Sequence, residues 1–194
     1  MSPRTAEDAN TADPAKFPGW RNLTKQLLEA RQEIGETIGK VSNFTDKELQ
    51  DNLKSGPNMF TRLIEAAEPM QAFVNRENAD RLLSDYNLPP AQNDRMAENL
   101  QAGAKVLLAL LDTDNKVSED KPSPFAGKVS LRDLGDADKT PALNRDWIID
   151  LLSIYDMAAR LIEASSHAKK YAGNAESLHS KIDQIVGRPA KEKP

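Results

Sequence analysis

The residues best suited to chemistry in this chain are two histidines and the glutamates spaced one helical turn before them. His167 and His179 are the only histidines among the 194 residues. Glu176 precedes His179 at the Glu-x-x-His spacing of di-iron helical bundles, and Glu163 precedes His167 by about one turn. Such a centre needs two Glu-x-x-His motifs and two further inward glutamates, whereas one motif occurs here. We therefore predict no metal site and no cofactor, and keep these four residues as the candidates if a metal binds.

A second candidate for ligand chemistry is the acidic segment 112–120, "DTDNKVSED", whose acidic residues partly alternate as they do in calcium loops. A calcium loop also needs a glycine at its sixth position and a bidentate glutamate at its twelfth. The twelfth position here is Ser123, and the sixth is not glycine. The segment is therefore interpreted as a solvated acidic loop.

The residue patterns of nucleophilic and nucleotide-dependent enzymes are missing from the sequence. There is no cysteine, which excludes disulfides and thiolate ligands or nucleophiles. No Gly-x-Ser-x-Gly motif occurs, and the nine glycines form no phosphate-binding loop. These absences make an enzyme the less favoured class, although no pattern decides the question.

The charge pattern gives little support to nucleic-acid binding. The formal net charge is −4, and the segment from His167 onward carries six basic and three acidic residues. No aromatic residues interleave with these lysines, as they do in many nucleic-acid-binding surfaces. Lysines near a helix C-terminus also offset the helix dipole. We therefore do not expect a nucleic-acid partner.

The sequence has no apolar run of the ~20 residues that a membrane span needs. Its first 16 residues lack the apolar core of a cleaved signal peptide. A cytoplasmic protein is expected, with export without a cleaved signal peptide as the alternative.

The element expected to organise the chain is the segment "WIIDLLSIYDMAARLI", residues 147–162, in which twelve of sixteen residues are apolar. On a helix, the four polar positions fall within a strip of about 120°, whereas a helix on the outside of a bundle needs an apolar stripe of little more than ~100°. The surplus apolar surface predicts either a central helix covered by several others or a helix that partly faces another chain. A homodimer would combine the two.

The remaining patterns predict further helices on both sides of this segment. Apolar residues at spacings of three and four predict helices over about 19–42 and 90–111. Gly35 and Gly39, one turn apart in the first, either allow another helix to approach or weaken the helix end. Shorter helices are expected between 45 and 87, interrupted at Pro69, because proline lacks the N–H that a helix interior needs. A long helix is expected from Thr140–Pro141 to about residue 172, then a last helix beyond Gly173.

These elements predict an all-α fold, an antiparallel bundle of about five to seven helices with one long central helix. Residues 1–16 are expected to be a disordered tail, 17–187 a single domain and 188–194 a C-terminal tail. Within the domain, residues 112–140 are expected to form a long polar connection that Val129, Leu131 and Leu134 anchor to the bundle.

The favoured function is a non-enzymatic helical interaction module of an adaptor, chaperone-like or effector type. It would bind a protein partner through an apolar surface beside the long helix, with Trp147, Ile148, Tyr155 and Ile162 as the contact residues, or through the 112–140 connection. The alternatives are a metal-dependent or small-ligand-binding helical-bundle enzyme and a structural homo-oligomer.

Overall fold

The computed structural model describes residues 20–54, 59–84, 87–114, 122–136, 138, 143–166 and 168–185. The predicted tails and the predicted helix start at Thr140–Pro141 lie outside these residues. The described chain forms α2 (Trp20–Asn43), α3 (Asp46–Lys54), α4 (Met59–Ala67), the 3₁₀ helix η2 (Glu68–Val74), α5 (Arg76–Leu83), α6 (Pro90–Leu111), α7 (Leu131–Gly135), α8 (Arg145–Ser166) and α9 (Ala168–Ile185). No strand occurs in these residues, which confirms the all-α prediction. The short helix α7 brings the number of α-helices in them to eight, one more than the upper end of the expected range.

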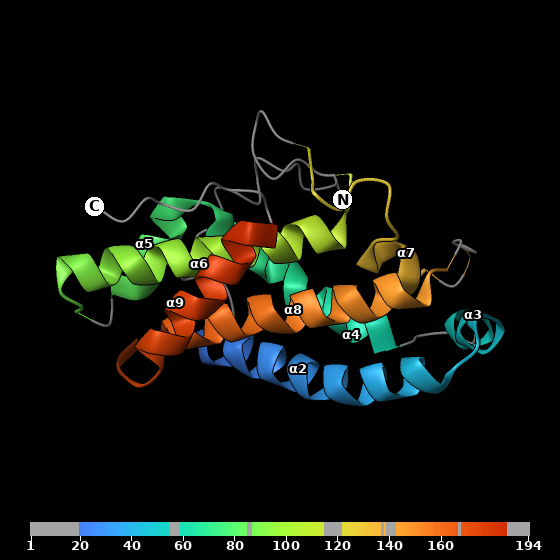
Figure 1. The fold of residues 1–194 in the computed structure, drawn as a ribbon. Coiled ribbons are helices and arrows are strands. Elements are labelled where there is room, and N and C mark those ends of the chain that lie inside the picture. The colour runs from blue at the N-terminus through green and yellow to red at the C-terminus, as the bar shows by residue number, and fades with distance from the viewer. Residues whose placement is uncertain are drawn as a thin grey trace.

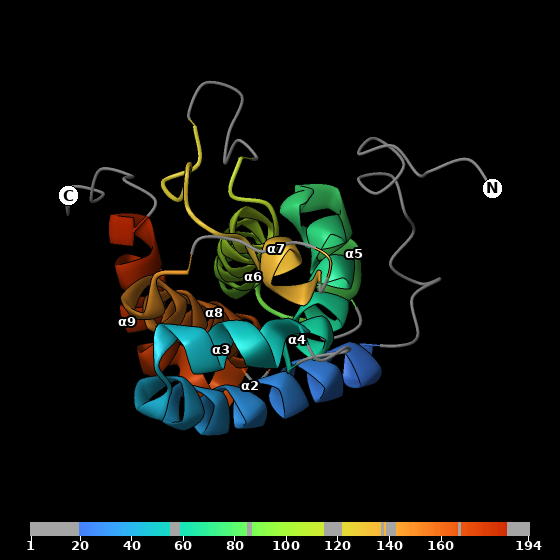
Figure 2. The same cartoon turned by 90° about the vertical axis from the view of Figure 1, so that its right-hand side faces the viewer.

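Helix α8, which contains the apolar segment 147–162, contacts α2, α6 and α9. In Figure 1 it lies between α6 and α2, and α9 turns back across it towards α6; Figure 2 shows the same grouping from the side. Its large apolar side chains are buried in one core with those of the neighbouring helices or pack against that core. The helix is thus central within its own chain, because three other helices cover its wide apolar surface.

Gly103 of α6 marks the closest approach of α6 and α8. A Cβ atom at this position would lie 2.6 Å from Cγ1 of Ile162 and 3.0 Å from the carbonyl oxygen of Ala158. Gly35 and Gly39 of α2 differ, since a Cβ on either would meet no atom within 4 Å. No other described helix therefore packs closely against these two glycines, and the close approach that they suggested in the sequence occurs at Gly103.

Local sequence signals set several helix boundaries. At the start of α3, the Thr45 hydroxyl accepts from the Glu48 N–H, and the Glu48 carboxylate accepts from the Thr45 N–H in return. The Asn75 side chain caps α5 by accepting from the N–H of Glu77. Pro69 lies where α4 gives way to the 3₁₀ helix η2, and Pro90 is the first residue of α6.

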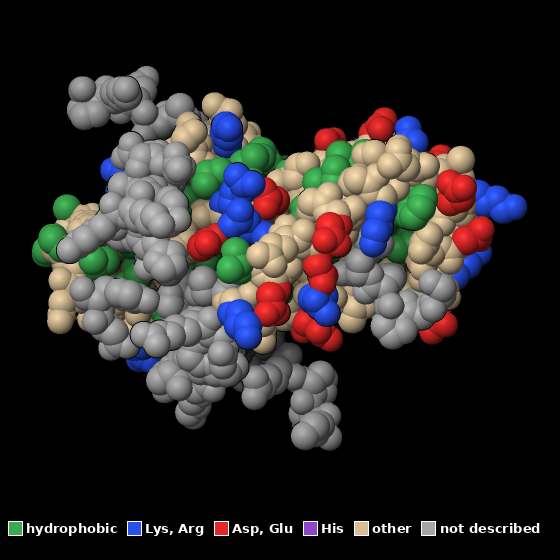
Figure 3. All heavy atoms as spheres, turned by 90° about the horizontal axis from the view of Figure 1, so that it is seen from below, with side chains coloured by type: hydrophobic (Ala, Val, Ile, Leu, Met, Phe, Trp, Pro, Cys, Tyr) green, Lys and Arg blue, Asp and Glu red, His purple; other side chains and the backbone are tan. Residues whose placement is uncertain are grey.

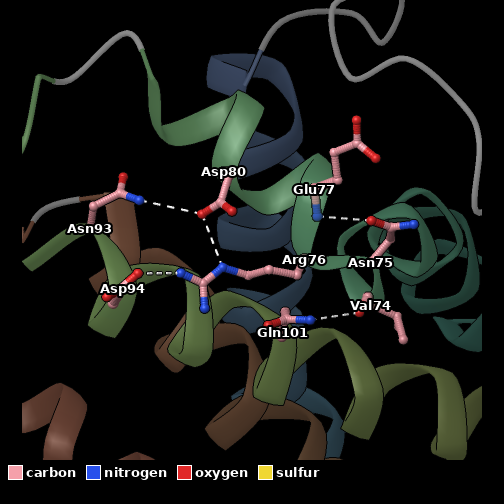
Figure 4. A network of polar contacts seen from close by, with 8 residues as sticks. All are labelled: Val74, Asn75, Arg76, Glu77, Asp80, Asn93, Asp94 and Gln101. Atoms are coloured by element: carbon pink, nitrogen blue, oxygen red, sulfur yellow. Dashed lines mark hydrogen bonds and ion pairs between the residues drawn. The ribbon is translucent and has the colours of Figure 1, made fainter. Parts of the chain in front are cut away.

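A network of charged side chains fastens α5 to the first turns of α6 (Figure 4). The Arg76 guanidinium donates to Asp80 at 3.0 Å and to Asp94 at 2.5 Å. The hydrogen bond to Asp80 is the main cause of a raised pKa for Arg76, which stays charged. The Asn93 amide also donates to Asp80. The network is structural, since each charged member is engaged by another side chain of the same group.

The long helix ends earlier than the sequence predicted. Instead of a helix running to about residue 172, α8 begins at Arg145, where the Asn144 side chain caps it, and ends at Ser166. Helix α9 starts at Ala168 and passes through Gly173 without interruption. A glycine inside a helix costs only about 1 kcal/mol relative to alanine. Packing of α9 onto α8 and α6 outweighs this cost.

The described part of the 112–140 connection packs onto the bundle. Leu131 and Leu134 are buried and Val129 is partly buried, as predicted. Ser130 and Asp133 form a capping box at the start of α7. Arg132 then bridges Asp112 and Glu68, so Asp112 of the acidic segment serves as an ion-pair partner of α7.

Candidate functional site

Three of the four residues predicted to contact a partner lie in the protein's own core. The side chains of Ile148, Tyr155 and Ile162 are 0% exposed. Tyr155 donates its hydroxyl to the carbonyl oxygen of Leu63 in α4 at 2.9 Å, and burial raises the pKa of this phenol far above its ordinary value. Because packing within the chain covers these three side chains completely, they offer no surface to a partner in this structure.

Trp147, the fourth of these residues, is half-buried and anchors the connection before α8. Its indole N–H donates to the carbonyl oxygen of Val129 at 2.9 Å. Its ring lies 5.6 Å from that of Phe125, and the Lys128 ammonium lies 5.9 Å from the ring centroid. The residue is therefore occupied by contacts within the chain on several sides.

An open groove does lie beside the long helix, on a different side of α8. It consists of two adjoining hollows of about 590 and 400 Å³, which we call the α2–α8–α9 groove. The two hollows share Leu28, Arg31 and Arg160. Their other described lining residues are Gln32, Ile34, Gly35, Ile38, Ser153, Asp156, Glu163, Ala164, Ser177, Leu178 and Lys181.

Leu28 distinguishes this groove from the rest of the described surface. At 40% exposed, it is the only exposed large hydrophobic side chain among the residues whose side chains the structure describes. Figure 3, which looks onto the α2 side of the molecule, shows apolar side chains in small groups separated by charged ones. Leu28 lines both hollows, so this partly exposed side chain lies where they meet.

Charged side chains divide the groove and tie its helices together. Arg31 of α2 donates to Asp156 at 3.1 Å and also pairs with Glu163, both on α8. Arg160 pairs with the second oxygen of Asp156 at 2.9 Å. The arrangement holds α2 against α8 and leaves apolar surface on both sides of a line of charges.

The metal candidates are not brought together in the described structure. Glu163 pairs with Arg31 of α2, whereas the His179 ring contacts Asn99 of α6. His167 and the side chain of Glu176 lie outside the described residues. No group of three or more residues suited to hold a metal ion occurs in the part of the chain that the structure describes.

His179 instead belongs to a buried polar cluster between α6 and α9. Its Nδ1 contacts the side-chain oxygen of Asn99, and its Nε2 lies 3.3 Å from the Asp183 carboxylate. Asn99 is 2% exposed, and its Nδ2 has no partner among the described atoms. With both ring nitrogens engaged, His179 has none left for a substrate, so the cluster positions α9.

Replacing His179 with alanine is expected to lower the free energy of unfolding by about 1–3 kcal/mol, because it leaves the buried Asn99 oxygen without a partner. Urea denaturation measures the change, and hydrogen exchange of the α9 amides locates it. Lys181→Ala, an exposed change on the same helix, is the control and should stay within about 0.5 kcal/mol of the parent. Equal effects of the two substitutions would contradict a stabilising role for the cluster.

Sequence reasoning missed the groove because it followed the apolar residues of 147–162. Three of the four polar positions in that segment, Ser153, Asp156 and Arg160, line the groove. The polar strip was visible in the sequence, but the neighbours that turn a polar strip into one wall of a groove come from α2 and α9.

Fold and site define an all-helical protein with an amphipathic groove between its long helices. No known protein family, curated protein or solved structure matches the chain. In the described residues, no helix is both long and apolar enough to cross a membrane.

Proposed function

We propose that this protein is a non-enzymatic interaction module that binds a helix of a partner protein in the α2–α8–α9 groove. The observation that carries the proposal is the exposure of Leu28 where the two hollows meet. A groove between helices that holds an accessible apolar side chain suits the apolar face of a partner helix. The sequence predicted a partner contact on the face of α8 that proves to be buried. The present proposal places the contact on the side of α8 that faces the groove.

A groove of this kind suits binding better than catalysis. Its two acidic side chains, Asp156 and Glu163, both pair with Arg31, which leaves neither as an unengaged general base. The groove is open along its length and formed by helices, as in proteins that accept an amphipathic helix. A cytoplasmic location and a homodimer stay predictions beside this proposal.

The variant Leu28→Asp is expected to weaken partner binding at least about tenfold, which corresponds to ~1.4 kcal/mol. The physical reason is that a charge in the apolar centre of the interface must lose its water on binding. Because Leu28 is 40% exposed and aspartate is a poorer helix former than leucine, the free protein should lose about 1–2 kcal/mol of stability and stay folded, which thermal unfolding confirms. The measurement is affinity capture from the native host, combined with a photo-crosslinker at Gln32 in the groove.

Gln26→Asp is the matched control, since it adds the same charge to α2 on the side that faces α4. A partner that crosslinks at Gln32, is lost with Leu28→Asp and is retained with Gln26→Asp supports the proposal. A partner captured equally by both variants binds elsewhere, and that result would reject the groove as the docking site.

A further inference from the structure

The partner's chemistry can be inferred from the groove, and this inference rests on the proposed function. The described lining of the groove presents three cationic side chains, Arg31, Arg160 and Lys181, and two anionic ones. Both carboxylates, those of Asp156 and Glu163, pair with Arg31. The local balance is therefore positive, although the whole chain has a net charge of −4.

Two of these cations are available to a bound molecule. The Arg160 side chain is 54% exposed, and its contact with Asp156 uses Nε at 2.9 Å. Lys181 is exposed and makes no ion pair within the described chain. A carboxylate placed between α8 and α9 could accept from both, which favours acidic side chains in the partner.

The shape of the groove indicates a helix as the occupant. The lining residues on α2 run from Leu28 to Ile38, a length of about 15 Å or roughly three helical turns. The described chain has no strand, so it offers no sheet edge to which an extended peptide could add. An amphipathic helix instead presents apolar side chains at i, i+3, i+4 and i+7 beside charged ones, which suits a groove where Leu28 and Ile38 lie next to charged side chains.

Gly35 shapes the wall of the groove at its α2 side. A Cβ atom here would touch nothing within 4 Å, so no contact within the described chain requires a glycine. A glycine in an exposed helix interior costs about 0.5–1 kcal/mol relative to alanine. Because Gly35 has no side chain, a partner backbone could come closer to the half-buried Ile38 at this wall.

We infer that the α2–α8–α9 groove recognises an amphipathic helix of about three turns that carries acidic side chains. Its apolar face would lie on Leu28 and Ile38, which are exposed and half-buried, respectively, in the groove. Its carboxylates would face Arg160 and Lys181, at the end of the groove where α9 forms the wall.

The test uses the full chain and a displayed library of amphipathic helical peptides with randomised charged positions. Enriched sequences should carry an excess of Glu and Asp and should lose binding to the Leu28→Asp variant. The best acidic peptide is then compared by fluorescence anisotropy with a matched peptide in which every Glu is replaced by Lys. We expect the acidic peptide to bind at least about tenfold more tightly, with the difference shrinking as salt rises.

The charge-reversed double variant Arg160→Glu, Lys181→Glu should invert this preference, and the Arg160→Gln, Lys181→Gln variant should abolish it. Thermal unfolding of each variant confirms that it is folded. Enrichment of neutral or basic peptides, or no enrichment, would overturn the inference, as would equal binding of an acidic oligonucleotide at the same site.

The inference and the proposed function fail in different ways. A native partner that requires Leu28 but is insensitive to both charge variants would keep the docking groove and reject acidic recognition. Peptide binding that ignores Leu28→Asp would reject the groove itself.

Discussion

Alanine in place of Tyr155 is expected to lower the free energy of unfolding by about 3–5 kcal/mol, a range typical of deleting a fully buried aromatic side chain. The Tyr155 ring is completely buried in the hydrophobic core of the protein. Its hydroxyl donates a hydrogen bond to the carbonyl oxygen of Leu63 at 2.9 Å. Since domains of this size are stable by only about 5–15 kcal/mol, the loss is a large share of the total. Urea denaturation followed by circular dichroism measures it.

Tyr155→Phe separates the hydrogen bond from the packing. It keeps the ring and removes only the hydroxyl, so the expected loss is about 1–2 kcal/mol. Leu28→Asp provides the opposite control, with a smaller loss of stability and with binding reduced. If Tyr155→Ala left stability unchanged and abolished only partner binding, the assignment of this residue to the core would be wrong.

Gly103→Ala is expected to destabilise the protein by about 1–3 kcal/mol, although alanine is the better helix former. The added methyl carbon would lie 2.6 Å from Cγ1 of Ile162 and 3.0 Å from the backbone oxygen of Ala158. The Ile162 side chain is held in a packed core, and the Ala158 oxygen belongs to the backbone of α8. Neither can easily move away, so α6 and α8 must separate to make room for the methyl group. Chemical denaturation measures the loss.

The same substitution at Gly39 is the matched control and should have the opposite sign. Nothing lies within 4 Å of a Cβ there, so Gly39→Ala should stabilise the helix by about 0.5–1 kcal/mol. Combining Gly103→Ala with Ile162→Ala should cost less than the sum of the single changes, because the second removes the atom that the first contacts. Equal effects of Gly103→Ala and Gly39→Ala would contradict the close approach.

Several helix boundaries are set by signals contained in a few neighbouring residues. The Thr45–Glu48 capping box, the Asn75 cap and the effects of Pro69 and Pro90 depend on hydrogen bonds or ring geometry within about one turn of helix. The apolar excess of 147–162 likewise indicated a helix surrounded by neighbours, because its width on a helical wheel depends only on residue order.

Features that join distant segments could not be read in this way. The sequence placed the end of the long helix near Gly173, whereas α8 ends at Ser166 and α9 continues through that glycine. The pair Gly35 and Gly39 suggested a close approach of another helix. The structure instead has a close approach of two helices at Gly103, which has no glycine one turn away. In both cases the local cost of a glycine is small compared with the packing free energy of a helix against the core.

By itself, then, the order of residues determined the all-helical class, most of the caps and the need to cover residues 147–162 on several sides, because these follow from periodicity and short-range hydrogen bonding. Tertiary structure decided that Tyr155 and Ile162 are core and that Ser153, Asp156 and Arg160 line a groove with Leu28. The physical reason is that a helix has one sequence but several faces, and only the positions of α2, α6 and α9 determine which face is covered and which stays open.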